Sequence, residues 1–310
     1  MNLSVIFATH RRPETLGPML ARFCALEADD LEWEVIVIDN AGDEQTNAIV
    51  ASYADRIPVR VLRETTPGKN NALNRGVSEA SGSLFVFTDD DILPSPDWLR
   101  ELAAGAARWP DNDVFGGRIV PAFPEGRTPV LEATHPFYRA AYVVADWEQD
   151  EGPCHATQVW GPNMMVRATL FSGGWSFDPA FGPNGTDYVM GSETEFTARL
   201  EAAGHEPVYL PQASVEHQIR DEQLGAPWLF GRAMRAGRME ALKSGHPGGA
   251  NLFGAPRYLT RAVVGAWLRY TLALSPRAKL HAGIELGRLR GQFREYRAMR
   301  QYRVMNGSGA

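Results

Sequence analysis

LFVFTDDD, residues 84–91, is an apolar run that ends in three consecutive carboxylates, Asp89, Asp90 and Asp91. A short run of aromatic and branched apolar residues is typical of a strand that is buried on both faces of a parallel sheet. Carboxylates that follow such a strand lie at the carboxyl edge of the sheet, where open α/β sheets bind ligands. Because a buried unpaired charge is very costly, we expect a bound cation or a basic side chain to neutralise these acids. The alternative is a solvated acidic turn before Pro94.

The segments before this run predict an α/β fold with a mostly parallel sheet. Apolar runs alternate with segments in which apolar residues recur at helical spacing. Such alternation predicts parallel strands that are joined by right-handed crossovers and flanked by helices. The expected strands are 3–8, 33–38, 59–62 and 84–88, and the expected helices begin at Pro13, at Asp43 and near Ala72. Further along the chain, residues 157–166 are also strand-like.

Length and composition indicate a globular protein with one large α/β domain and an appendage. The chain has 310 residues, of which 44% are hydrophobic and 22% are charged, as in ordinary soluble domains. Its two cysteines, Cys24 and Cys154, give neither a disulfide framework nor a zinc-binding spacing. The first residues show no secretory signal pattern. We therefore expect a reducing, cytoplasmic location.

The C-terminal segment 255–310 is strongly basic. It has eleven Arg and Lys against two Glu, whereas the whole chain has a net charge of −6. A basic segment on an acidic body indicates an anionic partner such as a membrane surface or nucleic acid. Its apolar run 262–274 is interrupted by Arg269 and is too short to span a bilayer. Helices of this kind suit the interface of an anionic membrane; packing on the rest of the protein, or on a second subunit, is the alternative.

Two clusters of polar side chains lie on predicted helices. Lys69, Asn70 and Arg75 belong to a cluster at a helix N-terminus, which suits phosphate or ribose oxygens. Ser192 is expected to be the N-cap of a helix with Glu195 three residues later, a capping box. A third, basic set would face a diphosphate, lipid headgroups or solvent: Arg232, Arg235 and Arg238.

Several short segments together resemble family 2 glycosyltransferases of the GT-A fold, over roughly residues 1–240. The segments are VIFATHRRP (5–13), VIVIDN (35–40), KNNALNRG (69–76), TDDD (88–91), GPNMMVR (161–167) and GSETEF (191–196). The resemblance implies a Rossmann-like sheet and an inverting, metal-dependent enzyme that uses a nucleotide-diphospho-sugar. The chain departs from the family pattern at His10, where Tyr is usual, and at Ser192-Glu193, where the family usually has Glu-Asp.

The resemblance also implies roles for individual residues. Glu193 matches the catalytic base, Asp91 a ligand of the divalent metal, Mn or Mg, and His217 the residue that completes its coordination. From the residues alone, Glu193 could be a solvated acid, His217 structural, and Asp39 a cap of the next segment. The residues expected at the nucleotide-sugar are Thr9, Arg11, Asp39, Lys69, Asn70, Arg75, Asp89 and Asp90. Those expected at the acceptor are Trp160, Asn163 and Glu195. Trp160 could instead pack in the core.

These observations predict a catalytic domain at 1–220, with a nucleotide-sugar half at about 1–120 and an acceptor half at about 121–220. A basic helical extension would occupy 221–310. The expected activity is sugar transfer to a hydroxyl of a sugar, lipid-linked or small-molecule acceptor, in the synthesis of cell-surface polysaccharide, glycolipid or glycoconjugate. A sugar-nucleotide pyrophosphorylase would be expected to carry a glycine-rich nucleotide loop directly after its first strand. The loop at that place, Thr9-His10-Arg11-Arg12, lacks glycines, so this alternative is less consistent with the chain. A non-catalytic nucleotide-sugar or polysaccharide-binding protein is the other alternative. Nucleic acid is not expected, because no recognised nucleic-acid module accompanies the basic tail.

Overall fold

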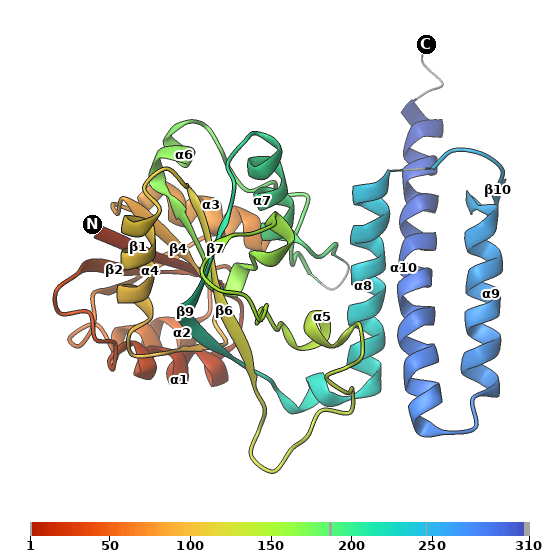
Figure 1. Ribbon diagram of the computed structural model, residues 1–310, viewed down its shortest axis with the longest axis horizontal. Coiled ribbons are helices and arrows are strands. Elements are labelled where there is room, and N and C mark those ends of the chain that lie inside the picture. The colour runs from red at the N-terminus through yellow and green to blue at the C-terminus, as the bar shows by residue number, and fades with distance from the viewer. Residues whose placement is uncertain (1, 186–187, 246, 307–310) are drawn as a thin grey trace. The chain divides into compact units, whose positions relative to one another are not determined.

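The computed structural model of the protein describes residues 2–185, 188–245 and 247–306, with side chains as far as residue 299 (Figure 1). The chain divides into two compact units, which are described separately. The first comprises 1–124, 142–187 and 191–219, and the second comprises 125–141, 188–190 and 220–310. The second unit thus includes two short segments that the sequence analysis assigned to the acceptor half.

The first unit is built on one mixed sheet, in the order β3-β2-β1-β4-β8-β6-β9-β5. β1, β2, β3 and β4 are parallel, β8 is antiparallel to both β4 and β6, and β6 is parallel to β9. The expected α/β class and mostly parallel N-terminal sheet are therefore confirmed. The bounds are β1 Asn2–Thr9, β2 Glu32–Asp39, β3 Val59–Arg63, β4 Leu84–Phe87, β5 Ile92–Pro94, β6 Val114–Ala122, β7 Gly152–Pro153, β8 Met164–Arg167 and β9 Val208–Gln218.

Helices cover both faces of this sheet. Val5 and Val86 face a core made with α1, α2 and α4, whereas Ile6 and Phe87 face a second core made with α3, α6 and α7. α3 lies directly on the sheet, because a Cβ at Gly76 would be 2.5 Å from Cγ2 of Ile6. The helix bounds are α1 Pro13–Phe23, α2 Glu44–Ala51, α3 Lys69–Glu79, α4 Trp98–Arg108, α6 Ala168–Ser172 and α7 Ser192–Ala202. The short helix α5, Tyr138–Tyr142, belongs mostly to the second unit.

Two local expectations were wrong. Residues 157–166 do not form one strand: 3₁₀ turns at Ala156–Gln158 and Gly161–Asn163 precede β8. The expected capping box at Ser192 does not form either. Gly191 is the N-cap in the left-handed conformation (φ 92°), and Ser192 starts the helix instead. Glu193 is nevertheless in the first turn of α7, as expected.

The second unit contains three helices that run side by side, α8 Ala226–Ser244, α9 Arg257–Leu272 and α10 Pro276–Asn306 (Figure 1). A short hairpin, β10 Asn251–Leu252 and β11 Ala255–Pro256, precedes α9. Glycines let α8 and α10 approach closely: a Cβ at Gly237 would lie 1.9 Å from the carbonyl oxygen of Arg288. None of the helices in the described part of the chain is long and apolar enough to cross a membrane.

The expected basic face of α8 is used inside this unit. Nε of Arg232 donates to the carbonyl oxygen of Ala140, and Nε of Arg238 lies 2.8 Å from a carboxylate oxygen of Glu295. The guanidinium of Arg235 lies over the ring of Tyr188, 5.2 Å from its centroid. These three arginines therefore stabilise the helical unit and do not form a solvated basic face.

Candidate functional site

The three acids follow β4 at the carboxyl edge of the sheet, and two basic side chains neutralise them. Arg12 lies just before α1, and its Nη1 is 3.0 Å from Oδ1 of Asp90 and 3.3 Å from Oδ2 of Asp91. Lys69, at the start of α3, forms an ion pair with Asp89. The expected neutralisation by basic partners is therefore present, and the acids are not a solvated turn.

Asp90 is the most constrained of the three acids. Its carboxylate is buried, and Oδ2 accepts a 2.7 Å hydrogen bond from the hydroxyl of Thr9. Burial raises the pKa of Asp90 to about 6, although the guanidinium of Arg12 lowers it and the carboxylate of Asp91 raises it again. Thr9 and Asp90, both expected at the nucleotide-sugar, are thus hydrogen-bonded to each other at the carboxyl edge of the sheet.

Asp91 and His217 are brought together by strand pairing. β5 starts directly after Asp91 and pairs with β9, with Ile92 opposite His217. Nε2 of His217 lies 3.4 Å from Oδ1 of Asp91, and both side chains are only 5% exposed. Nδ1 of His217 is buried and has no hydrogen-bond partner among the described residues. A buried imidazole beside a carboxylate is an arrangement that needs a further polar partner.

This pair fits a divalent cation that takes its remaining ligands from a bound molecule. Imidazole and carboxylate together suit Mn²⁺ and related ions, and hard cations often complete their coordination with substrate phosphates. Within the described residues, no group of three or more His, Cys, Asp or Glu side chains is placed to hold a metal ion. An ion held by Asp91 and His217 would therefore need further ligands from a bound molecule.

Glu193 lies beside Lys69, the basic side chain that also contacts Asp89. Nζ of Lys69 is 2.5 Å from Oε1 of Glu193 and also contacts Asp89, so that one ammonium group bridges two carboxylates. Burial by itself would lower the pKa of Lys69, but Asp89 and Glu193 more than offset this effect and raise it. Lys69 therefore stays charged, and it joins the proposed base to the acids after β4.

The backbone at Gly161 makes room for Glu193. A Cβ on Gly161 would lie 2.3 Å from Cδ and 2.4 Å from Oε1 of Glu193. Contacts this short do not occur between real side chains, so any larger residue at position 161 would displace the carboxylate. The carboxylate of Glu193 thus packs on the turn that precedes β8, and its side chain is 13% exposed.

Two of the residues expected at the nucleotide-sugar are engaged with the protein itself. The carboxylate of Asp39 accepts hydrogen bonds of 2.8–2.9 Å from the backbone N–H groups of Ala41, Gly42 and Asp43. It therefore caps the loop before α2, the simpler role that the sequence left open. The side chain of Asn70 donates to the carbonyl oxygen of Asp178 and accepts from the hydroxyl of Ser192. These bonds join α3 to the segment before α7 and to the first residue of α7.

The other residues expected at the nucleotide-sugar are exposed. Arg11 has a left-handed backbone conformation (φ 55°) and lines an open cavity of about 590 Å³ at the carboxyl ends of β1 and β2, together with Pro13 and Gly42. Arg75 is half-exposed and forms an ion pair with Glu79 one turn along α3. Arg12, which was not among the expected site residues, contacts the acids instead. Its position next to Pro13, at the start of a helix that follows β1, was the available signal.

The residues expected at the acceptor all make contacts within the protein. The amide of Asn163 is fully buried: Oδ1 accepts from Nε1 of Trp98, and Nδ2 donates to two backbone carbonyl oxygens. Glu195 forms an ion pair with Arg199 one turn along α7. Trp160 packs edge to face on Trp147, with ring centroids 5.7 Å apart, and lies against the core. These contacts give each of the three residues a structural role.

The sequence of the chain is similar to that of known proteins. The model of the family described as "Glycosyl transferase family 2" matches residues 4–170. A dolichol-phosphate mannosyltransferase of Pyrococcus furiosus is 33% identical over 104 residues, 33% of this chain and 29% of the relative. A pre-mycofactocin glycosyltransferase of Mycobacterium tuberculosis is 26% identical over 245 residues, 76% of this chain and 46% of the relative. The chain thus spans less than half the length of these two curated relatives.

Solved structures share the fold at low sequence identity. The structure of TarS 1–349 from Staphylococcus aureus in complex with UDP-GlcNAc has a TM-score of 0.57 and 15% identity, and covers 99% of this chain and 92% of that one. The mannosyltransferase PcManGT from Pyrobaculum calidifontis, in complex with GDP-Man and Mn²⁺, has a TM-score of 0.56 and 18% identity, and covers 99% and 86%. At these identities the likeness concerns the fold alone.

Proposed function

The chain belongs to glycosyl transferase family 2, and we propose from this that it moves a sugar, with inversion, from a nucleotide-diphospho-sugar to an acceptor hydroxyl. The observation that carries the proposal is the convergence of Glu193, Lys69 and Asp89 at the sheet edge where Asp91 meets His217. Sugar transfer needs a general base and stabilisation of a leaving diphosphate, and the two groups of residues suit these two tasks.

Asp91 and His217 would hold the divalent cation. When bound, the cation would neutralise the donor diphosphate and stabilise its charge as it leaves. The complex of PcManGT with GDP-Man and Mn²⁺ supports a cation in this role. Arg12 keeps the carboxylates of Asp90 and Asp91 at the sheet edge in spite of their mutual repulsion. Asp89, which Lys69 binds, is expected to face the donor.

Glu193 would act as the general base. In the proposed reaction the acceptor oxygen attacks the anomeric carbon, the bond from that carbon to the diphosphate oxygen breaks, and the hydroxyl proton passes to Glu193. The ammonium of Lys69 holds the Glu193 carboxylate in one orientation, and Gly161 leaves room for it. A fixed base avoids the loss of rate that misplacement by about 1 Å brings, of order 10²-fold.

The direct test is release of nucleoside diphosphate from a panel of nucleotide-sugars, measured with Mn²⁺ and with a chelator. We expect at least one donor to be hydrolysed or transferred with Mn²⁺ only. Glu193→Gln keeps the shape but not the basicity, and should reduce the rate by about 10²–10⁴-fold with donor affinity nearly unchanged in calorimetry. Wild-type transfer by Glu193→Gln would move the base elsewhere, to Glu195 or to Asp187, which lies outside the described residues.

We propose that the sugar transfer serves the synthesis of cell-surface polysaccharide, glycolipid or glycoconjugate. The relatives include enzymes named for such products: TarS as a poly(ribitol-phosphate) β-N-acetylglucosaminyltransferase, and a hyaluronan synthase of Pasteurella multocida. A panel of acceptors offered with the donor found above distinguishes these classes, because only a true acceptor turns hydrolysis into transfer.

A further inference from the structure

The outer face of α9 exposes an unusual number of large apolar side chains. Its inner face is buried at Leu259 and Ala266, so the helix packs in the unit through one side only. We call the exposed apolar residues of this helix and its two flanks the α9 face. They are Leu252, Phe253, Tyr258, Val264, Trp267, Leu268, Leu272 and Leu274, with exposed fractions from 41% to 102%.

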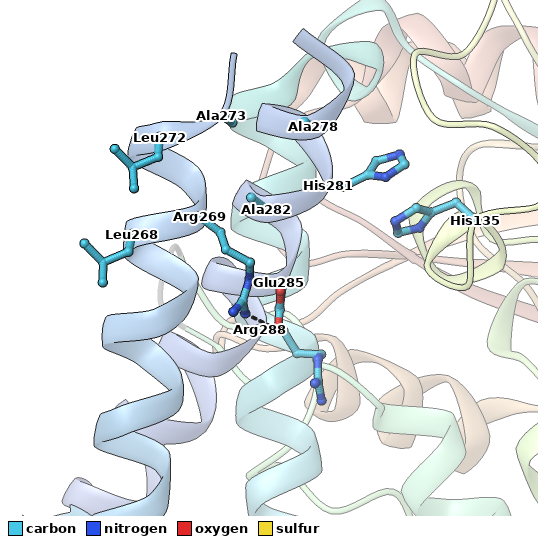
Figure 2. A pocket seen from close by; sticks show the side chains of 10 residues that line it. All are labelled: His135, Leu268, Arg269, Leu272, Ala273, Ala278, His281, Ala282, Glu285 and Arg288. Carbon is cyan, nitrogen blue, oxygen red and sulfur yellow. Dashed lines mark hydrogen bonds and ion pairs between the residues drawn. The ribbon is translucent and has the colours of Figure 1, made fainter. Parts of the chain in front are cut away.

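The α9 face is continuous along the helix. Val264, Leu268 and Leu272 are four residues apart and therefore lie in one row. Figure 2 shows Leu268 and Leu272 pointing away from α10, on the side opposite to the packed side of α9. Leu274, two residues beyond the end of the helix, is fully exposed. Large continuous apolar patches of this kind usually mark a surface that binds a partner.

The charges on α9 are all positive. The helix contains three arginines and no acidic residue. Arg269 is ion-paired with Glu285 of α10. Arg257 and Arg261 are exposed, and no ion pair joins them to any residue in the described part of the chain. In a helix Arg257, Arg261, Val264 and Leu268 share one face. The partner must therefore offer apolar surface and negative charge together.

We propose that the α9 face docks on an anionic lipid bilayer, with the helix lying in the plane of the interface. Apolar and aromatic side chains such as Leu272 and Trp267 would enter the boundary between headgroups and acyl chains, and Arg257 and Arg261 would bind lipid phosphates. A second copy of the same helix fits less well, because it would offer these arginines no carboxylate. The sequence left two alternatives for 255–310, a membrane contact or packing on the protein or a second subunit. Because α10 packs on both α8 and α9, we place the membrane contact on α9 and its flanks alone.

An open cavity of about 720 Å³ lies beside the α9 face (Figure 2). Five of its ten lining residues are ionisable: His135, Arg269, His281, Glu285 and Arg288. Its two arginines are each ion-paired with a glutamate, so neither adds a free positive charge to the α9 face.

Docking of this kind needs no catalytic activity, so it is tested separately from sugar transfer. Full-length protein is sedimented with vesicles of phosphatidylcholine alone and with vesicles that also contain phosphatidylglycerol, at low and high salt. We expect binding to the anionic vesicles only, weakened as salt screens the arginines. Arg257→Gln with Arg261→Gln should weaken binding by about 10- to 30-fold, given about 1 kcal/mol per arginine.

Matched variants separate the α9 face from general surface properties. Leu272→Glu should abolish binding, whereas Val130→Glu, at a 52% exposed apolar residue outside α9, should leave it unchanged. Arg22→Gln with Arg56→Gln removes the same charge from the other unit and should have no effect. Equal recovery of wild type in the supernatant with both vesicle types would overturn the proposal. So would a dimer, seen by light scattering, that Leu272→Glu dissociates, because the face would then join two copies.

Discussion

Nζ of Lys69 lies 2.5 Å from Oε1 of Glu193, and the same ammonium contacts Asp89. One side chain from the start of α3 thus holds together the first turn of α7 and the acids that follow β4. Without this ammonium, two carboxylates would face each other with no counter-charge between them. Lys69 is therefore expected to position the base, beyond any contact that it makes with a donor.

Lys69→Gln should lower kcat by about 10²-fold, because Glu193 would turn away from Asp89 once the ammonium is lost. Lys69→Arg should restore part of this loss, since it keeps the charge. Steady-state kinetics of both variants is the measurement, with Ser78→Ala on the exposed side of the same helix as the control. An effect confined to KM would show that Lys69 serves donor binding only.

Gly161→Ala should also displace the carboxylate of the proposed base, Glu193. The added methyl group would lie 2.3 Å from Cδ of Glu193, so the carboxylate must move, and we expect a loss of kcat of about 10²-fold. Gly17→Ala is the control, since a Cβ there meets nothing within 4 Å. If Gly161→Ala keeps its rate while its Tm falls, the close approach matters for packing alone.

Asp91→Ala should remove the effect of metal on donor binding. In calorimetry with Mn²⁺ the variant should bind the donor at least about tenfold more weakly than wild type, and its affinity should not change with a chelator. His217→Ala should show a smaller change in the same direction. The chain offers a control pair in Asp113 and His205, whose Oδ2 and Nδ1 lie 2.7 Å apart. Donor affinity that still responds to Mn²⁺ in Asp91→Ala would place the cation elsewhere.

The buried carboxylate of Asp90 should make the stability of the metal-free protein depend on pH. Burial raises the pKa of Asp90 to about 6, so its protonation stabilises the folded state. This stabilisation is complete below the ordinary carboxyl pKa of about 4 and is lost as the pH rises through about 6. Asp90→Asn mimics the protonated form, and Arg12 still has Asp91 as a partner. The variant should therefore melt above wild type near pH 8, with a difference that shrinks near pH 5. A lower Tm at pH 8 would show that the ion pair with Arg12 outweighs burial.

The sequence by itself determined the N-terminal half of the fold and the position of the acids. Strands expected at 3–8, 33–38, 59–62 and 84–88 correspond to β1, β2, β3 and β4. The physical reason is local: buried parallel strands are nearly continuous apolar runs, and the helices between them require helical spacing of apolar residues. Since parallel strands end at one edge, the sequence also implied that Asp89 lies there.

Only the tertiary structure decided which side chains meet the acids. The turn after β1 places Arg12, and not Arg11, on Asp90 and Asp91. The pairing of β5 with β9 sets His217 beside Asp91. Contacts between segments far apart in the chain depend on strand register and helix docking, which no local pattern encodes.

The same limit applies to residues that the sequence could not sort into core and surface. The amide of Asn163 forms hydrogen bonds with Trp98 and with two backbone carbonyl groups. This arrangement depends on which residues pack around Asn163 in the folded protein. In α9, Leu259 and Leu272 are equally apolar, yet one is buried and the other is 72% exposed. The apolar residues of α9 indicated that this helix packs on an apolar surface. Only the packing of α8, α9 and α10 decided which side of α9 stays exposed and available to a partner.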